Sequence, residues 1–505
     1  MRWGLVAMAM AAAGVLAVPA QATPADGVAA NRARILADYV ELLAIPNVAS
    51  DTPNIRRNAD RLVEMMQARG LAPRLLEGAD PSVPPAVYGE WKVPGATRTL
   101  VLYAHYDGQP VTPEDWKSTP PFEPKLLTGR LDKGGKVIPL PKPGEAIDPD
   151  WRLYGRAASD DKAGVMAILL AVDALRAEGK RPGFNLKIFL EGEEEAGSPH
   201  LADILARHKA LLQSDGWVIF DGPAHQTGAK QVVLGVRGVL SADITVYGPL
   251  RPLHSGHYGN WAPNPAMLLS KLLGSMKDDS GRVTVAGFYD DVTPLSAAER
   301  AAIAAVPNGD EALKADLGLG WTEGEGRPLI ETTHEPSLNV DGLRSADVGE
   351  KARNVIPSTA TATIDMRLVA GNDHQRQFDK VVAHIRQQGF FVTDTEPTAG
   401  QRRQNKWVAR IVKHGGYNAE RTPLDHPLAR DVTAAVRTVQ PGAVVLPSLG
   451  GSLPLYLLRE GLSAPSVTLS LANHDNNQHA EDENLRLGNL WDAIDVAAAL
   501  MTMGR

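Results

Sequence analysis

Four glutamates lie within five positions of one short segment, FLEGEEEAGSPH (residues 189–200), directly after an apolar run. Carboxylates held this close repel one another, so they either take up protons or bind a cation. The chain has no cysteine, and zinc and similar divalent ions accept carboxylate and imidazole ligands without thiols. The segment therefore predicts a metal site to which its glutamates contribute.

Other metal-type ligands stand beside apolar segments elsewhere in the chain. TLVLYAHYD ends on His105 and Asp107, WVIFDG ends near Asp221, Asp160 precedes a long apolar segment, and His479 lies in QHAEDEN. The carboxyl ends of parallel strands meet at one edge of an α/β sheet. We therefore expect these side chains to converge at that edge.

Each of these residues also has an ordinary structural explanation. His105 alone is typical of a buried core histidine, Asp160 of a helix N-cap and Asp221 of a turn. A run of three glutamates is usually a solvated face. His474 lies close enough in the sequence to take the place of His479 as a ligand, although we prefer His479 for its neighbours. Only the combination of these residues makes a metal site the better interpretation.

The elements that must position these residues alternate between strands and helices. Apolar periodicity predicts helices and short strands in the following ranges: 29–44, 56–69 and 163–178 as helices, and 99–104, 184–190 and 217–220 as strands. Residues 109–149 are rich in proline and glycine and are expected to form a loop-dominated excursion. The alternation predicts an α/β fold with a mostly parallel sheet sandwiched by helices.

A second unit with a different periodicity interrupts this pattern. VLSADITVYG and TATATIDMRL alternate with period two, as strands with one buried face do. We expect an inserted α+β (ferredoxin-like) lid and dimerisation domain over residues 237–394. The catalytic domain would then consist of residues 23–236 and 395–505.

The N-terminus has the organisation of a secretory signal peptide over residues 1–22. Arg2 precedes an apolar stretch and an A-x-A signal ends at Ala22. The apolar stretch is short for a membrane anchor, which needs ~20 residues. We therefore expect cleavage near Thr23, export to the periplasm or the medium, and no stable membrane insertion. The net charge of −7, without a long basic block, argues against a nucleic-acid partner.

Eight motifs in a fixed order carry a resemblance to a known family. They are HYDGQP, GRAASDDKAG, EGEEEAGS, IFDG, PLHSGHYGN, NVIPSTATATIDMRL, GGSLP and QHAEDEN. Together they closely resemble the two-zinc exopeptidases and deacylases, a family that includes carnosine dipeptidase, carboxypeptidase G, aminoacylase and succinyl-diaminopimelate desuccinylase. GFYDDV and TPLDHP make the carnosine-dipeptidase branch the most similar.

The resemblance implies two divalent metal ions, zinc in the first place, with manganese or cobalt as alternatives. His105 and Asp221 match the ligands of one ion, Glu195 and His479 match those of the other, and Asp160 matches the ligand that bridges both. The family often has a cis peptide bond after that aspartate.

The resemblance also implies roles in catalysis. Glu194 matches the general base that takes a proton from the attacking water and passes it to the leaving amine. Asp107 matches a carboxylate that orients the metal-binding histidine. His254 matches a histidine that stabilises the oxyanion, commonly in the site of the other subunit of a homodimer.

Further matches concern substrate binding. Arg367 and Asn354 match positions that hold the terminal carboxylate and backbone of the substrate, and an arginine fork suits a carboxylate. Gly451 and Ser452 match a loop of the family whose backbone N–H groups approach the same carboxylate.

The expected function is hydrolysis of the amide bond of a dipeptide or short peptide with a free carboxylate. An N-acyl-amino-acid deacylase uses the same chemistry and stays the main alternative. A metal-free binding protein of the same fold is a remote one, because Glu194 and the full ligand set are present.

Overall fold

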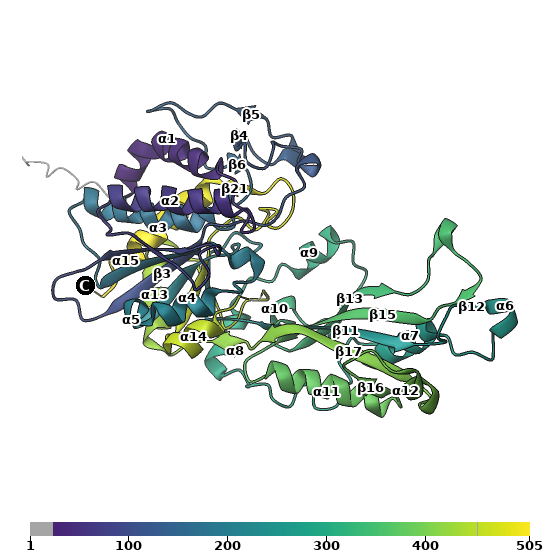
Figure 1. The fold of residues 1–505 in the computed structure, drawn as a ribbon. Helices are drawn as coiled ribbons and strands as arrows, with labels where there is room; N and C mark the ends of the chain where they lie inside the picture. The colour runs from purple at the N-terminus through teal and green to yellow at the C-terminus, as the bar shows by residue number, and fades with distance from the viewer. Residues whose placement is uncertain (1–23, 452, 505) are drawn as a thin grey trace, which may run out of the picture.

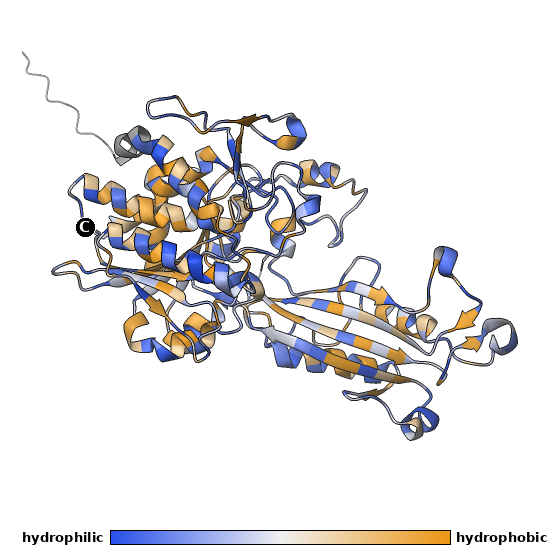
Figure 2. Ribbon diagram, turned by 45° about the horizontal axis from the view of Figure 1, so that its top comes forward, coloured by the Kyte–Doolittle hydropathy of each residue, from blue (hydrophilic) through white to orange (hydrophobic). Residues whose placement is uncertain are grey.

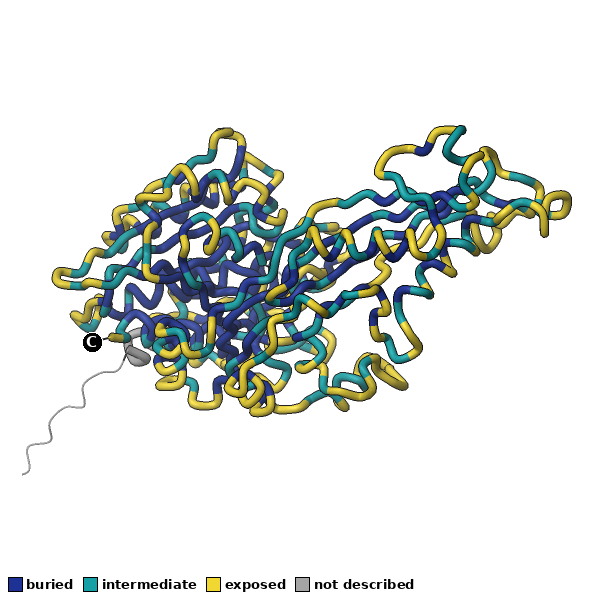
Figure 3. The backbone as a smooth tube through the Cα atoms, turned by 90° about the horizontal axis from the view of Figure 1, so that it is seen from below, coloured by how far each residue is buried: buried dark blue, intermediate teal, exposed yellow. Residues whose placement is uncertain are grey.

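The computed structural model describes residues 24–451 and 453–504. The predicted signal peptide lies outside the described residues. The chain forms two units, a larger one that contains both ends of the described chain and an elongated second one (Figure 1). Buried backbone is concentrated in the larger unit and follows the strands of the second (Figure 3).

An eight-stranded sheet forms the centre of the larger unit. Its strands, in spatial order, are β1 (Arg74–Leu76), β2 (Ala86–Trp91), β7 (Asn185–Glu191), β3 (Thr99–His105), β8 (Gly216–Phe220), β20 (Ser466–Ser470), β9 (Gln231–Val233) and β19 (Val444–Leu446). The four central strands, β7, β3, β8 and β20, are parallel to one another. Their carboxyl ends therefore meet at one edge, as predicted, whereas β2 and β9 run antiparallel to their central neighbours.

Helices cover both faces of this sheet. One face carries α1 (Pro24–Leu43), α2 (Thr52–Ala68), α3 (Lys162–Ala177), α13 (Pro427–Val439) and α15 (Leu487–Met501), and the other carries α4 (Leu201–Arg207), α5 (Lys209–Leu212) and α14 (Tyr456–Leu462). Side chains of β3 alternate between the two cores, with Leu102 in the first and Tyr103 in the second. This sandwich confirms the predicted fold class.

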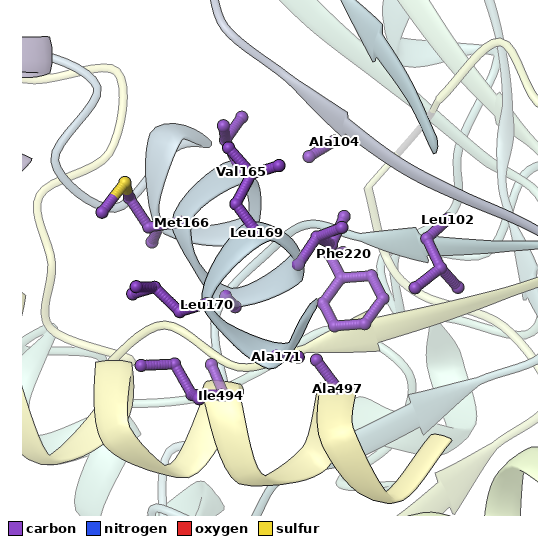
Figure 4. Packing of buried hydrophobic residues seen from close by; sticks show 14 of the residues in the cluster. Leu102, Ala104, Val165, Met166, Leu169, Leu170, Ala171, Phe220, Ile494 and Ala497 are labelled. Carbon is purple, nitrogen blue, oxygen red and sulfur yellow. The ribbon is translucent and has the colours of Figure 1, made fainter. Parts of the chain in front are cut away.

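Helix α3 lies at the centre of the first core. It is apolar on nearly every side, and Leu170 packs beside Ile494 of α15 while Phe220 lies between α3 and the sheet (Figure 4). Its N-cap is Asp161, whose side chain accepts from the backbone N–H of Gly164. Hydrophobic residues are accordingly concentrated on the sheet-facing helices (Figure 2).

A small antiparallel sheet lies beside the main one. Its strands are β21 (Asn484–Arg486), β6 (Arg152–Tyr154), β4 (Lys125–Leu127) and β5 (Val137–Ile138), and the 3-10 turns η1 (Pro113–Asp115) and η2 (Leu131–Lys133) lie in the same region of the chain. Residues 109–149 were expected to be mainly loop. Short strands form there because β6 pairs with both β4 and the late strand β21.

The second unit is a five-stranded sheet with helices on it. The strands, in spatial order, are β13 (Ser337–Arg344), β15 (Thr359–Leu368), β11 (Gly238–Tyr247), β17 (Val408–Tyr417) and β16 (Phe391–Thr393). Helices α7 (Pro265–Gly274) and α11 (His374–Gln387) pack on it. The chain order β11, α7, β13, β15, α11, β17 is the predicted ferredoxin-like order.

The predicted end of the insertion at residue 394 is too early. Strand β17 pairs with β11 from Val408 to Tyr417, so the sheet of the second unit extends well beyond that position. The chain then returns to the larger unit through β18 (Glu420–Arg421), which pairs with β10 (Gly235–Val236). A short helix, α12 (Ala399–Gln404), precedes β17.

Part of the predicted insertion packs against the larger unit. This segment contains α8 (Ala297–Ala304), α9 (Asp310–Asp316) and α10 (Leu329–Thr332). Val306 joins Val233, Val444 and Leu446 in a small core against β9 and β19. At the end of the second unit that is remote from the larger unit lie β12 (Leu253–His254), α6 (Ser255–Tyr258) and β14 (Val355–Ile356) (Figure 1). The turn η4 (Gly349–Lys351) comes just before β14 in the chain.

Candidate metal centre

Five of the predicted ligands lie at the carboxyl edge of the central strands. His105 ends β3, Asp221 follows β8, and Glu195 lies in the 3-10 turn η3 (Glu194–Ala196) that follows β7. Asp160 directly precedes the N-cap of α3, to which it is joined by a cis peptide bond. His479 lies in the loop between β20 and β21.

Three of these residues form a buried group. His105, Asp160 and Asp221 each offer one ligand atom, and these atoms lie within 4.8 Å of one another. The Nε2 atom of His105 is 3.0 Å from Oδ1 of Asp160. Asp160 is not the N-cap of α3, because Asp161 has that role. His105 is buried, but its ring faces a carboxylate and not only the apolar core.

A second group shares Asp160 with the first. The Nε2 atom of His479 lies 3.2 Å from Oδ2 of Asp160 and 3.3 Å from Oε2 of Glu195. His474, the alternative ligand, is in neither group. Asp160 therefore faces one histidine with each of its carboxylate oxygens.

Asp107 connects the first histidine to the acidic turn. Its Oδ1 is 3.3 Å from Nδ1 of His105, and its two oxygens accept from the backbone N–H groups of Glu194 (3.2 Å) and Glu195 (3.0 Å). One buried carboxylate thus orients the His105 ring and the η3 backbone together.

The glutamates of the acidic segment separate into different environments. Oε2 of Glu194 lies 3.9 Å from Nε2 of His105, and burial raises the pKa of Glu194 well above its usual value. Glu193 pairs instead with His200 at 2.8 Å. Glu191 accepts from the hydroxyl of Tyr103 at 2.8 Å. Only two of the four glutamates, Glu194 and Glu195, therefore face the metal-type ligands.

Two residues of the site were not predicted from the sequence. Nε2 of Gln109 donates to Oε2 of Glu195 at 2.8 Å. Glu483 is buried, and its Oε1 accepts from the backbone N–H groups of Ser159 (2.8 Å) and Asp160 (3.0 Å). Its Oε2 accepts from Arg156 at 2.9 Å. In the sequence, the acidic run after His479 could have indicated a buried carboxylate near the site. Nothing in the run indicates which of its carboxylates turns inward.

The charge balance of the two groups fits divalent cations. Burial, followed by the charge of Asp160, raises the pKa of Glu195 to about 8 and that of Asp221 to about 6. These shifts express the cost of placing several carboxylates together out of water. Imidazole nitrogen and carboxylate oxygen are ligands that zinc, manganese and cobalt accept. The donor set therefore fits metal ions.

The predicted substrate-binding residues lie in two separate places. Arg367 lies near the base of the second unit, which is the end that joins the larger unit. Its Nε is 3.1 Å from Oδ2 of Asp365. Gly451 lies in the same neighbourhood, because its carbonyl accepts from the backbone N–H of Arg237, whose Nη2 donates to the Arg367 carbonyl at 3.5 Å. Ser452 lies outside the described residues.

The other two predicted residues lie at the far end of the second unit. His254 ends β12, is exposed, and accepts from the backbone N–H of Gly256. The Asn354 carbonyl accepts from the backbone N–H of Ser255. Figure 1 shows β12 at the end of the second unit remote from β3. Neither residue therefore reaches the metal-type ligands of its own chain.

A parallel-sheet edge with two histidines, three carboxylates and an adjoining glutamate defines a metal-dependent hydrolase. Residues 101–503 match the Peptidase family M20/M25/M40, and the chain belongs to this family. The match confirms the resemblance seen in the motifs and the prediction of a metallohydrolase.

Similar proteins cover nearly the whole chain. The Cys-Gly metallodipeptidase of Candida albicans is 27% identical over 88% of this chain and 90% of its own length. The human Beta-Ala-His dipeptidase is 26% identical over 90% of this chain and 83% of its own length. The structure of an M20 family metallo-carboxypeptidase from Sulfolobus solfataricus has a TM-score of 0.74 at 27% identity, covering 92% of this chain and 98% of its own.

The prediction of export was wrong. The relatives that align along most of this chain include Cys-Gly metallodipeptidases of three yeasts, and this kinship contradicts a periplasmic or secreted enzyme. The signal-like features that suggested export lie in residues 1–22, outside the described residues. Across residues 24–451 and 453–504, no helix has the length and apolar character that crossing a membrane requires.

Proposed function

We propose that this protein is a metallodipeptidase that hydrolyses the amide bond of a dipeptide or short peptide with a free carboxylate. The observation that carries this proposal is the position of Glu194 beside two ligand groups that share Asp160. The names of the similar dipeptidases support the substrate class.

We further propose two divalent cations, with zinc before manganese or cobalt. His105 and Asp221 would hold one, Glu195 and His479 the other, and Asp160 both. When bound, such ions polarise a carbonyl group and lower the pKa of water.

Glu194 is the general base in this proposal. Its carboxylate takes the proton of the attacking water and then gives it to the amine that leaves. Burial raises the pKa of Glu194, and bound divalent cations would lower it again. Asp107 positions this base indirectly, because it accepts from the Glu194 backbone N–H and faces the His105 ring.

The substrate carboxylate would be bound near the base of the second unit. Arg367 would pair with it through its guanidinium, and the backbone at Gly451 and Ser452 would approach it. His254 and Asn354 would act on the site of a partner subunit, with His254 stabilising the oxyanion. This arrangement requires a homodimer formed through the second unit, which would also serve as a lid.

The test compares Glu194→Gln with Glu193→Gln, its neighbour that pairs with His200. Bound metal and hydrolysis are measured for dipeptides and for N-acetyl and N-succinyl amino acids. We expect Glu194→Gln to keep its metal and lose ~100- to 10,000-fold in kcat, the usual contribution of general acid–base catalysis. Glu193→Gln should stay near wild-type activity.

Three results would contradict parts of this proposal. Normal turnover by Glu194→Gln would remove its role as the base. Cleavage of acylated amino acids in preference to dipeptides would identify a deacylase. A purified protein without metal and without activity would favour a binding protein.

A further inference from the structure

A cavity of about 520 Å³ lies between the α8–α10 segment and the larger unit. One wall is formed by Pro223 and Ala224, which follow β8, and by His474. The opposite wall comes from Ile303 of α8, Leu313 of α9 and the chain at α10. The cavity is thus bounded on one side by a segment that lies between α7 and β13 in the sequence but packs on the larger unit.

The walls of this cavity adjoin both parts of the candidate site. Pro223 is two residues beyond Asp221, and His474 belongs to the loop that carries His479. On the other side, Gly450 lines the cavity next to Gly451, whose carbonyl accepts from the backbone N–H of Arg237 at 3.1 Å. The cavity is therefore lined by close sequence neighbours of two metal-type ligands at one wall, and by a neighbour of Gly451, in the loop proposed for the substrate carboxylate, at another.

The lining offers an apolar surface. Val306 and Leu446 are buried in the small core under the cavity, and Ile303, Leu313, Leu329 and Ile330 add further aliphatic side chains.

Three polar groups of the lining already have partners. Nδ1 of His225 lies 2.9 Å from Oγ1 of Thr227, and Nε2 of Gln231 donates to the Pro223 carbonyl at 2.8 Å. Asp310 accepts from the Leu329 backbone N–H at 2.8 Å. An apolar group that enters the cavity therefore leaves these hydrogen bonds intact.

We propose that this cavity is the subsite for the side chain of the carboxyl-terminal residue of the substrate, and that it favours a large apolar side chain. The inference rests on the proposed dipeptidase function, because it needs the substrate carboxylate at the Gly451 loop. A side chain attached next to that carboxylate then has the cavity as its neighbour. Transfer of an aliphatic or aromatic side chain from water into such a cavity stabilises the bound substrate.

The test measures kcat/KM for Gly-Gly, Gly-Leu and Gly-Phe with the metal-loaded wild-type enzyme and two variants. Ala304→Trp places an indole in the cavity from the last residue of α8, which is exposed. Ala301→Trp is the matched control, one helical turn earlier, also exposed and outside the lining. Melting temperatures of the three proteins identify any general loss of folding.

We expect wild-type enzyme to prefer Gly-Leu and Gly-Phe over Gly-Gly at least tenfold, the scale of apolar side-chain discrimination. Ala304→Trp should reduce this preference to about twofold or less by raising KM for the two apolar substrates, and Ala301→Trp should keep it. A wild-type enzyme without the preference, or a preference that survives in Ala304→Trp, would overturn the subsite. Failure of the wild type on all dipeptides would instead overturn the proposed function.

Discussion

At the scale of single residues, buried carboxylates outside the two ligand groups hold the backbone of the site in place. Glu483 is the strongest example, because its two oxygens accept from Arg156 and from the backbone N–H groups of Ala157, Ser159 and Asp160. These hydrogen bonds fix the backbone that carries Asp160, the proposed shared ligand. A residue that holds a metal ligand in place typically contributes ~10- to 100-fold to metal affinity.

We therefore expect Glu483→Gln to bind metal ~10- to 100-fold more weakly than wild type. Whichever way the amide turns, its NH2 group faces N–H donors, so a hydrogen bond is replaced by a repulsive contact. Metal affinity is measured by titration of the metal-free protein, and its melting temperature separates a local effect from unfolding. The control is Glu481→Gln, an exposed glutamate of the same loop, and equal affinities of the two variants would contradict the positioning role.

At the scale of elements, the loop that carries His479 is held by the small sheet. Oδ2 of Asp475 lies 2.9 Å from Nη2 of Arg152, in β6, and 2.9 Å from Nη1 of Arg130. Burial alone would raise the pKa of Asp475, but hydrogen bonds from Arg152 and Asn473 and the charge of Arg130 lower it to about 2. These contacts attach the loop between β20 and His479 to β6 and to the turn at Arg130.

The lowered pKa of Asp475 predicts a pH-dependent effect of Asp475→Asn on stability. Between the folded pKa of about 2 and the ordinary value of 3.8, the unfolded chain binds more protons, so stability rises with pH. The contribution of the Asp475 charge to the free energy of unfolding is complete above pH 3.8 and is lost as pH falls through this range. Because the side chain is one-third exposed, we expect only about 1–2 kcal/mol, or a few degrees in Tm.

Thermal melting of Asp475→Asn and wild type at pH 7, 5, 4 and 3 measures this effect. The difference in Tm should be largest at pH 7 and 5 and fall to roughly half by pH 3. The exposed Asp148→Asn serves as the control and should melt with the wild type throughout. A difference that stays constant down to pH 3 would mean that the Asp475 charge is not what stabilises the fold.

At the scale of the whole molecule, the elongated second unit separates two sets of predicted residues. Arg367 and Gly451 lie at its base, whereas His254 and Asn354 lie at its far end, remote from β3 (Figure 1). A single chain therefore has no means of bringing His254 to Glu194 in this conformation. If both residues act in one reaction, they come from different subunits.

The proposed exchange between subunits predicts complementation of two inactive variants. His254→Ala and Glu194→Gln should each lose ~100-fold or more in kcat. When the two variants are mixed, dissociated and reassociated, about half of the dimers contain one subunit of each kind. In each mixed dimer, one of the two sites has both His254 and Glu194. About a quarter of the wild-type activity should therefore return.

The matched control is His257→Ala, whose ring centroid lies 4.6 Å from that of His254 on the same exposed turn. This variant should stay active. Light scattering establishes the oligomeric state of each protein. A fully active monomer, or a mixture that recovers nothing although mixed dimers form, would contradict the proposed role of His254.

The sequence by itself determined the types of ligand, the family and the fold class. Period-two and helical patterns depend on neighbouring residues, and residues at the ends of parallel strands must share one edge of the sheet. His105 and Asp221 could therefore be assigned to one place from the strand pattern alone. The acidic segment indicated a metal site because close carboxylates either take up protons or bind a cation.

Only the tertiary structure decided how distant segments meet. It brings His479, not His474, against Asp160 and Glu195, and it turns Glu483 inward to Arg156, 327 positions away in the chain. It also extends the second unit to β17 and folds the α8–α10 segment against the larger unit. Such contacts depend on the path of each loop in space and on the packing beneath it, which the local sequence pattern does not specify.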